Sequence, residues 1–348
     1  MRITLLSIVY TLIRRLTLSL VYLSQAVFRQ KRDMEPAVLI GDMGIKWVRR
    51  CAPRALFQSP VYPNLERRLY DLTFPSPLTF SAFKHEPDCI KLWLDLGMGG
   101  GCLKTILPQM RPGNTRPRIQ EREGGDLVNA MGFPGDGIPV FLKEVEQHIL
   151  PFVSQPIGFS LGGGSIEEYR IAFRSLNDFV KRFPEKQLYY EMNISCPNVK
   201  NGRKLTKHPE LLKELLLEIR SETDRVVGVK LSPDQTDEML LTFAKLIYSV
   251  PRTYVNVGNT QYVTDSRLSV GGGGMSGPSL LKRTKEMVSL ICDVGVPIVA
   301  TGGVRTRDDV AYFLEQGVVM VGMATALVQN PFCVPKINQS LARGRHNV

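Results

Sequence analysis

The first 32 residues of this 348-residue chain contain no acidic side chain, although they carry six basic ones. Through residue 70 the chain has twelve Lys and Arg against four Asp and Glu, so this segment holds +8 of the formal +11 net charge. Basic charge concentrated at one end, beside apolar residues, is typical of segments that meet anionic lipid headgroups. We therefore expect a membrane surface as a partner and no nucleic acid.

The same segment lacks an uninterrupted run of the ~20 apolar residues that a bilayer-spanning helix needs. Its two apolar runs, 3–13 and 16–28, are separated by Arg14 and Arg15. We therefore expect an amphipathic helical anchor that lies in the membrane surface. Two alternatives stay open, an uncleaved signal anchor and, for a eukaryotic source, a mitochondrial presequence, because both are basic and poor in acids.

Cysteine pairs and metal-ligand spacings are also missing. The six cysteines include no C-x-x-C pair, so we expect reduced thiols in a cytosol-facing protein and no metal site. The chain has no low-complexity tract, and 43% of its residues are hydrophobic, which suffices for a large core. We expect a helical N-terminal segment over residues 1–64 and one domain over 65–340.

Most of the chain alternates short apolar runs with amphipathic segments. A unit of roughly 30 residues fits a closed (β/α)8 barrel, a TIM barrel of the α/β class, better than two doubly wound halves. We take the barrel to begin near the strand 72–74. The other expected strands are 156–161, 189–194, 226–231, 253–257, 297–300 and 318–323, and the expected helices are 166–182, 209–221, 237–249, 280–292 and 307–316.

Polar residues follow these strands at the end where barrel enzymes place their sites. The most informative stretch is 189–198, in which a strand ends at Cys196 and Pro197 prevents further ladder pairing. Each polar residue has a plainer alternative, such as a solvated lysine, a turn former or an inert buried thiol. Their shared position favours a site. The set comprises Lys84, Thr105, Asn193 with Cys196, Lys230, Asn259 and the pair Gly302-Gly303.

Glycines after the last strands indicate a phosphate site. Gly302 and Gly303 lie in one βα loop, and Ala324-Thr325 follows the final strand, where barrels often bind phosphate. The run 271–274 is either a flexible loop or a loop that approaches a ligand. These features predict a phosphorylated cofactor, and lysines beside a conjugated ring would stabilise the charge that accumulates on reduction.

Together these residues make the chain resemble the dihydroorotate dehydrogenases, which are FMN-dependent β/α barrels. The resemblance covers roughly residues 33 to 335. Its motifs occur in the family's order, and the series is specific although each motif alone is weak. They are Phe74-Pro-Ser-Pro77, Phe83-Lys84-His85, Pro112-Gly113-Asn114 to Arg118, Asn129-Ala-Met-Gly132-Phe133, Asn193 to Asn198, Val229-Lys230-Leu-Ser-Pro233-Asp234, Gly258-Asn259-Thr260, Gly273-Gly274-Met-Ser276-Gly277 and Thr301-Gly302-Gly303-Val304.

The resemblance implies oxidation of dihydroorotate to orotate in de novo pyrimidine biosynthesis. In the family, hydride passes from C6 to flavin N5 while a base removes a proton from C5, and Cys196 stands at the base position. By analogy Lys84 would touch the flavin and the substrate carboxylate, and Lys230 would lie at the N1/C2 carbonyl edge of the ring. The implied substrate residues are Asn129, Asn193, Asn198, Asn259 and Thr260, and the further flavin residues are Thr105, Gly274, Gly302, Gly303, Ala324 and Thr325.

Three departures from the family pattern bear on this site. The segment 79–83 is bulkier than usual and lacks an aspartate, which would crowd the flavin. Ser160 and Gly135 stand where asparagines are common, so fewer amides would grip the ring. An FMN enzyme acting on another pyrimidine, or an impaired flavin-binding homologue, therefore remains an alternative.

Two features of the sequence bear on the electron acceptor, and they point to different classes of the family. A cysteine base is usual in soluble members, which use fumarate or NAD, whereas quinone-linked members usually carry serine. The N-terminal extension, with Asp33-Met-Glu35-Pro36 as a helix opening, resembles the quinone-linked class. We predict a quinone-linked enzyme at a membrane, either the cytoplasmic face of a bacterial inner membrane or a mitochondrial inner membrane, with fumarate or NAD as the alternative acceptor.

Overall fold

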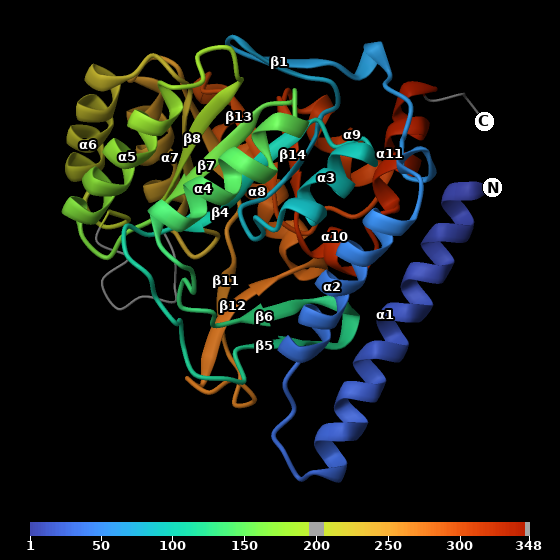
Figure 1. Ribbon diagram of the computed structural model, residues 1–348. Coiled ribbons are helices and arrows are strands. Elements are labelled where there is room, and N and C mark those ends of the chain that lie inside the picture. The colour runs from blue at the N-terminus through green and yellow to red at the C-terminus, as the bar shows by residue number, and fades with distance from the viewer. Residues whose placement is uncertain (195–204, 345–348) are drawn as a thin grey trace.

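The computed structural model describes residues 1–194 and 205–344, and its centre is a closed barrel of eight parallel strands (Figure 1). The strand order around the barrel is β10-β13-β14-β3-β4-β7-β8-β9. The predicted (β/α)8 barrel is confirmed. The strands are β3 (Leu78–Phe80), β4 (Gly100–Ile106), β7 (Ile157–Leu161), β8 (Leu188–Asn193), β9 (Val227–Leu231), β10 (Thr253–Val257), β13 (Ile298–Thr301) and β14 (Met320–Met323).

Helices cover the outside of the barrel and begin where side chains can cap them. Ser165 accepts a hydrogen bond from Glu168 N, and Thr306 forms a capping box with Asp309, so these helices start close to the predicted residues. The helices are α3 (Pro87–Asp95), α4 (Ile138–His148), α5 (Ile166–Val180), α6 (Pro209–Glu222), α7 (Asp237–Tyr248), α8 (Leu281–Ile291), α9 (Arg307–Glu315), α10 (Thr325–Gln329) and α11 (Cys333–Ala342). The short 3₁₀ turns are 54–56, 63–65, 123–125, 150–152, 278–280 and 292–294.

A hairpin closes the amino-terminal end of the barrel. It consists of β1 (Arg67–Leu69) and β2 (Leu72–Phe74), which pair antiparallel. Leu72 and Phe74 are buried against Tyr189 and Tyr254. The prediction that the barrel begins at 72–74 is therefore wrong, because those apolar residues plug the barrel floor and β3 is the first barrel strand.

A four-stranded antiparallel sheet projects from the site end of the barrel, in the order β11-β12-β6-β5 (Figure 1). Its strands are β5 (Ile119–Glu121), β6 (Leu127–Asn129), β11 (Gln261–Thr264) and β12 (Gly272–Ser276). The glycine run 271–274, expected as a loop, mostly lies in β12. Glycine is required there because a Cβ at Gly273 would lie 2.3 Å from Asn129 O. The close approach of two backbones, not flexibility, accounts for the run.

Two N-terminal helices flank the barrel, α1 (Arg2–Val27) and α2 (Glu35–Cys51) (Figure 1). One side of α1 packs against the barrel domain, where the Tyr10 hydroxyl donates a hydrogen bond to Val328 O of α10 at 3.1 Å. Both apolar runs lie in this single helix, which continues through Arg14 and Arg15, and Arg14 pairs with Glu121 of β5 at 2.8 Å. By length and composition alone, α1 could cross a membrane.

Gly258, directly after β10, holds the loop that carries Asn259. Its φ is +119°, and an added Cβ would lie 1.3 Å from Thr301 O. Gly258→Ala is therefore expected to lower the free energy of unfolding by about 4 kcal/mol, the range of severe steric substitutions. Gly271 offers a matched control, because it has φ +77° and no heavy atom within 4 Å of the added Cβ.

Gly271→Ala should cost only about 1 kcal/mol, the penalty of a left-handed alanine. Urea unfolding followed by circular dichroism compares the two variants. Equal midpoints for both would show that the backbone contact at Gly258 is not tight in solution.

Candidate active site

Four polar side chains form a hydrogen-bonded chain at the carboxyl ends of neighbouring strands. Asn259 Nδ2 donates to Asn193 Oδ1 at 2.9 Å, and Asn193 Nδ2 donates to Thr105 Oγ1 at 2.9 Å. The Thr105 hydroxyl also lies 2.8 Å from Ser160 Oγ. Three predicted site residues, Thr105, Asn193 and Asn259, are thus brought together, with Ser160 as an addition. We name this set the amide network.

Lys230 lies beside the amide network. Strand pairing aligns it with Asn193 on β8 and with Asn256 on β10, and residues in register on parallel strands point to the same face. Lys230 is buried. A buried lysine in register with two asparagines at the mouth of a barrel can stabilise negative charge on a ligand.

Asn129, Thr260 and Gly274 form a second group next to the first. Asn129 pairs with Gly274 across β6 and β12, and its Nδ2 donates to Gly274 O at 3.3 Å. A Cβ at Gly274 would lie 2.1 Å from Thr260 Oγ1. Since Thr260 follows Asn259, this group lies next to the amide network, so Asn129, Asn193, Asn259 and Thr260 are connected by contacts between neighbouring residues.

The glycines predicted to hold phosphate pack tightly against the start of α8. A Cβ at Gly303 would lie 2.4 Å from Leu281 N, at the start of α8, and one at Gly302 would lie 2.4 Å from Thr284 Oγ1. Thr325 Oγ1 lies 3.0 Å from Ser276 Oγ, which ties α10 to β12. Only glycine at these two positions lets α8 approach the loop backbone so closely.

Two buried hydroxyls inside the barrel mouth have no hydrogen-bond partner among the described residues, Ser81 Oγ and Thr301 Oγ1. Both face Gly322, since a Cβ there would lie 3.0 Å from Ser81 Oγ and 2.1 Å from Thr301 Oγ1. Buried polar atoms are rarely left unsatisfied. Unsatisfied hydroxyls at this place fit a polar ligand such as a flavin.

Comparison with known proteins shows the family of this chain. The family model described as dihydroorotate dehydrogenase matches residues 64–344. The chain belongs to the dihydroorotate dehydrogenase family. The dihydroorotate dehydrogenase (quinone) of Pseudarthrobacter chlorophenolicus is 30% identical over 350 aligned residues, which cover 90% of this chain and 96% of that protein. The protein of the same name from Mycobacterium tuberculosis is 28% identical, with coverage of 89% and 88%.

Solved structures of the family have the same fold. The ligand-free DHODH of Eimeria tenella matches with a TM-score of 0.73 at 23% identity and covers 87% of this chain and 93% of its own. The ferulenol complex of the same protein gives a TM-score of 0.71. The predictions of family and barrel fold are therefore confirmed.

The family lysine Lys84 has its ammonium turned toward α2. Its Nζ lies 2.5 Å from Asp42 Oδ2 and 3.6 Å from Glu86 Oε1. Burial disfavours the ammonium, but Glu86 and Asp42 outweigh burial and hold the pKa of Lys84 above its ordinary value. Lys84 thus connects the edge of the predicted site to the N-terminal helices, and it does not join the amide network.

Lys104 is a candidate residue that the sequence analysis missed. It directly precedes Thr105 on β4, and its Nζ donates to Pro134 O at 2.8 Å. With Thr105 and His85 it lines a small hollow, and burial lowers the pKa of Lys104. A lysine inside an otherwise apolar strand was the signal that could have found it. His85 has a buried Nδ1 without a partner among the described residues.

The other departures from the family pattern have clear positions. The rings of Phe80 and Phe83 both pack on Trp93 of α3, at centroid distances of 5.7 and 5.2 Å. Gly135 has open space, because its nearest neighbour to an added Cβ is Ile106 at 3.7 Å. Cys196 and Asn198 lie outside the described residues.

Proposed function

We propose that this protein oxidises dihydroorotate to orotate in pyrimidine biosynthesis, uses FMN, and passes the electrons to a membrane quinone. The amide network carries the proposal, because it places hydrogen-bonding amides beside Lys230 at the carboxyl end of a barrel whose family performs this reaction. A pyrimidine ring offers alternating N–H and C=O groups, which side-chain amides match as both donors and acceptors.

FMN would supply the two-electron acceptor. The cradle of Gly274, Gly302 and Gly303, with Ala324 and Thr325 at the start of α10, would hold its phosphate. Thr105 and Lys230 would lie at the ring, where the ammonium favours the electron-rich form. Lys84 would approach the ring and the substrate carboxylate when it leaves Asp42.

Asn129, Asn193, Asn198, Asn259 and Thr260 would bind and orient the pyrimidine. Cys196 would remove the proton at C5 of dihydroorotate. A free thiol titrates near ~8.5, so cations at the site are needed to favour the thiolate. Lys230 is in register with Asn193, which precedes Cys196 by three residues in the sequence, and would supply such charge from the neighbouring strand.

Quinone would reach the site past the N-terminal helices, for which we retain the segment boundaries 1–64 and 65–340. The outer faces of α1 and α2 expose large apolar side chains, which suit the hydrocarbon side of a membrane interface. These residues are Leu12, Leu16, Leu20 and Leu23 of α1 and Leu39, Met43 and Trp47 of α2.

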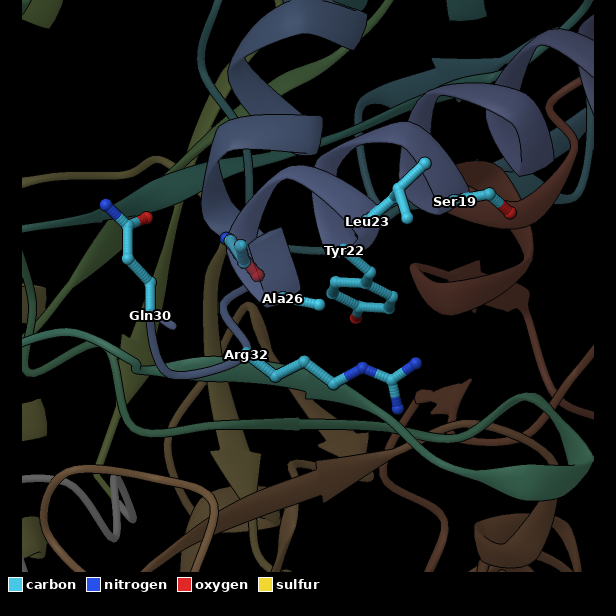
Figure 2. Close-up of a pocket in the computed structure, with 7 residues that line it drawn as sticks. Ser19, Tyr22, Leu23, Ala26, Gln30 and Arg32 are labelled. Atoms are coloured by element: carbon cyan, nitrogen blue, oxygen red, sulfur yellow. The ribbon is translucent and has the colours of Figure 1, made fainter. Parts of the chain in front are cut away.

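The end of α1 adds a basic element to this face. An open hollow of about 530 Å³ lies there, and Arg32 stacks over the Tyr22 ring at 4.4 Å (Figure 2). Within the described chain Arg32 forms no ion pair, so its guanidinium is available to a lipid phosphate. This arrangement supports membrane attachment of the N-terminal segment.

Steady-state turnover with different acceptors tests the proposed function. Purified protein in vesicles should oxidise dihydroorotate with a ubiquinone or menaquinone analogue much faster than with fumarate or NAD. Preference for either soluble acceptor would contradict the quinone assignment and leave the oxidation of dihydroorotate intact.

A second candidate, oxidation or reduction of another pyrimidine, is favoured by Ser160 and Gly135. The Ser160 hydroxyl is hydrogen-bonded to Thr105, and Gly135 has no side chain. A bound pyrimidine ring would therefore have fewer amide partners than is usual in the family. Flavin reduction measured with dihydroorotate and with dihydrouracil separates the two. Faster reduction by dihydrouracil would favour the second candidate.

Asp42→Asn should tighten the binding of orotate, which is an anion, by roughly three- to tenfold. The substitution removes one negative charge beside Lys84 and frees the ammonium from its 2.5 Å contact. Titration of the flavin absorbance with orotate measures the effect. Asp88→Asn is the matched control, because Asp88 also contacts α2, through Arg49 at 3.8 Å, without touching Lys84. Equal changes in both variants would contradict a role for Asp42 at the site.

A further inference from the structure

The interior of the barrel contains a buried carboxylate that the proposed reaction does not use. Glu191, on β8, is only 2% exposed. Strand pairing aligns it with Ser160 on β7 and with Gly228 on β9, so it points into the barrel. It lies two residues before Asn193 on the same strand face, and therefore one layer below the amide network.

Two donors converge on one oxygen of this carboxylate. The Tyr254 hydroxyl donates to Glu191 Oε2 at 2.9 Å, and Asn256 Nδ2 donates to the same oxygen at 2.8 Å. Burial raises the pKa of Tyr254, so its hydroxyl keeps the proton that it donates. An oxygen that accepts two hydrogen bonds is typical of an ionised carboxylate.

The sequence provides the space for this arrangement. A Cβ at Gly228 would lie 2.1 Å from Tyr254 Cζ, so only glycine at that position lets the ring lie under Glu191. The second carboxylate oxygen, Oε1, is buried and has no hydrogen-bond partner within residues 1–194 and 205–344. A buried charge that is only half satisfied is costly unless an opposite charge lies nearby.

Lys230 is the cation placed to compensate it. It follows Gly228 by two residues, so it points to the same face as Gly228, one layer nearer the mouth of the barrel. Asn256 is a register partner of Lys230 and also a hydrogen-bond donor to Glu191, and thus connects the two layers. Both charges act on one neighbour: burial raises the pKa of the Cys102 thiol, Glu191 raises it further, and Lys230 opposes the rise.

We propose that Glu191 is a positioning residue that balances the charge of Lys230 from beneath the flavin site and thereby makes the bound flavin harder to reduce. The inference rests on the proposed function. Lys230 alone would strongly favour the electron-rich reduced ring, which would slow the onward transfer of electrons. The Glu191 carboxylate, one layer below, offsets part of the stabilisation that Lys230 gives to the reduced flavin. The barrel interior has a low dielectric constant, so charges act there over several ångströms.

The test is the reduction potential of the flavin in the purified holoenzyme. Glu191→Gln removes the charge and keeps an oxygen that accepts both hydrogen bonds. When the potential of the solution is held constant, the ratio of reduced to oxidised flavin should rise about tenfold. This rise corresponds to an increase of about 30 mV in the reduction potential of a two-electron couple. Equilibration with a dye of known potential measures this ratio by absorbance.

Two further variants make the result decisive. Glu191→Met also removes the charge and fills a similar volume, so it should shift the ratio in the same direction even if the glutamine variant folds poorly. Tyr254→Phe removes one donor and keeps the charge, so its ratio should change less than twofold.

A ratio within twofold of the parent in both neutral variants, or a shift in the opposite direction, would overturn the inference. Purified parent protein without flavin would refute the proposed function as well, whereas a bound flavin whose potential does not move refutes the inference alone.

Discussion

Replacing Cys196 by alanine is expected to slow flavin reduction by dihydroorotate about 10²- to 10⁴-fold while FMN stays bound, because the change removes the proposed general base and leaves the glycines proposed to hold the phosphate unchanged. Stopped-flow absorbance under anaerobic conditions measures the reduction rate. Cys196→Ser should react more slowly than the parent protein, because a hydroxyl is harder to ionise than a thiol. It should keep part of the activity at high pH, where ionisation of the hydroxyl is easier.

Cys292→Ala is the matched control for this experiment. Cys292 is a free cysteine directly after α8 in the outer helical layer, so its loss should leave reduction unchanged. An unchanged reduction rate in Cys196→Ala would rule out the assigned base. Loss of bound FMN in that variant would instead show that Cys196 has a structural role.

The second large effect concerns the membrane. Leu16, Leu20 and Leu23 are 60%, 56% and 61% exposed on the outer face of α1, and burial of each leucine in lipid contributes roughly 1.5–3 kcal/mol. The triple replacement by glutamate should therefore weaken binding to lipid vesicles by more than about 100-fold. Turnover with a long-chain quinone in vesicles should fall by a similar factor, whereas turnover with a soluble dye should stay within about twofold.

Glutamates at Val140, Ile171 and Leu217 provide the control, because these side chains are also half exposed but lie on helices α4, α5 and α6 of the barrel. This variant should keep vesicle binding and quinone turnover. Equal loss with quinone and with dye in the α1 variant would contradict the role of this face in quinone access. Equal loss of vesicle binding in both variants would show that exposed apolar side chains bind lipid regardless of their position on the molecule.

Sequence periodicity predicted most of the barrel, for a physical reason. Strands buried on both faces are short continuous apolar runs, and the helices between them have one apolar side and local caps such as Ser165 and Thr306. Both signals are local in the chain. The convergence of Thr105, Asn193 and Asn259 then followed from the rule that the carboxyl ends of parallel strands meet at one edge.

Features that depend on distant contacts were not predictable in this way. Segment 72–74 has the composition of a barrel strand, and only its contacts with Tyr189 and Tyr254 identify it as the floor plug. The pairing of Lys84 with Asp42 joins residues 42 positions apart through a helix whose docking no local pattern reveals. Glycines in β12 looked like a loop because the backbone that approaches them belongs to another strand.

The central claim, that this barrel binds FMN and uses it to oxidise dihydroorotate, is tested most directly by one anaerobic titration. Purified protein should be yellow, and one equivalent of dihydroorotate should bleach the flavin absorbance and release one equivalent of orotate. A colourless protein, or a flavin spectrum that dihydroorotate leaves unchanged, would contradict the account.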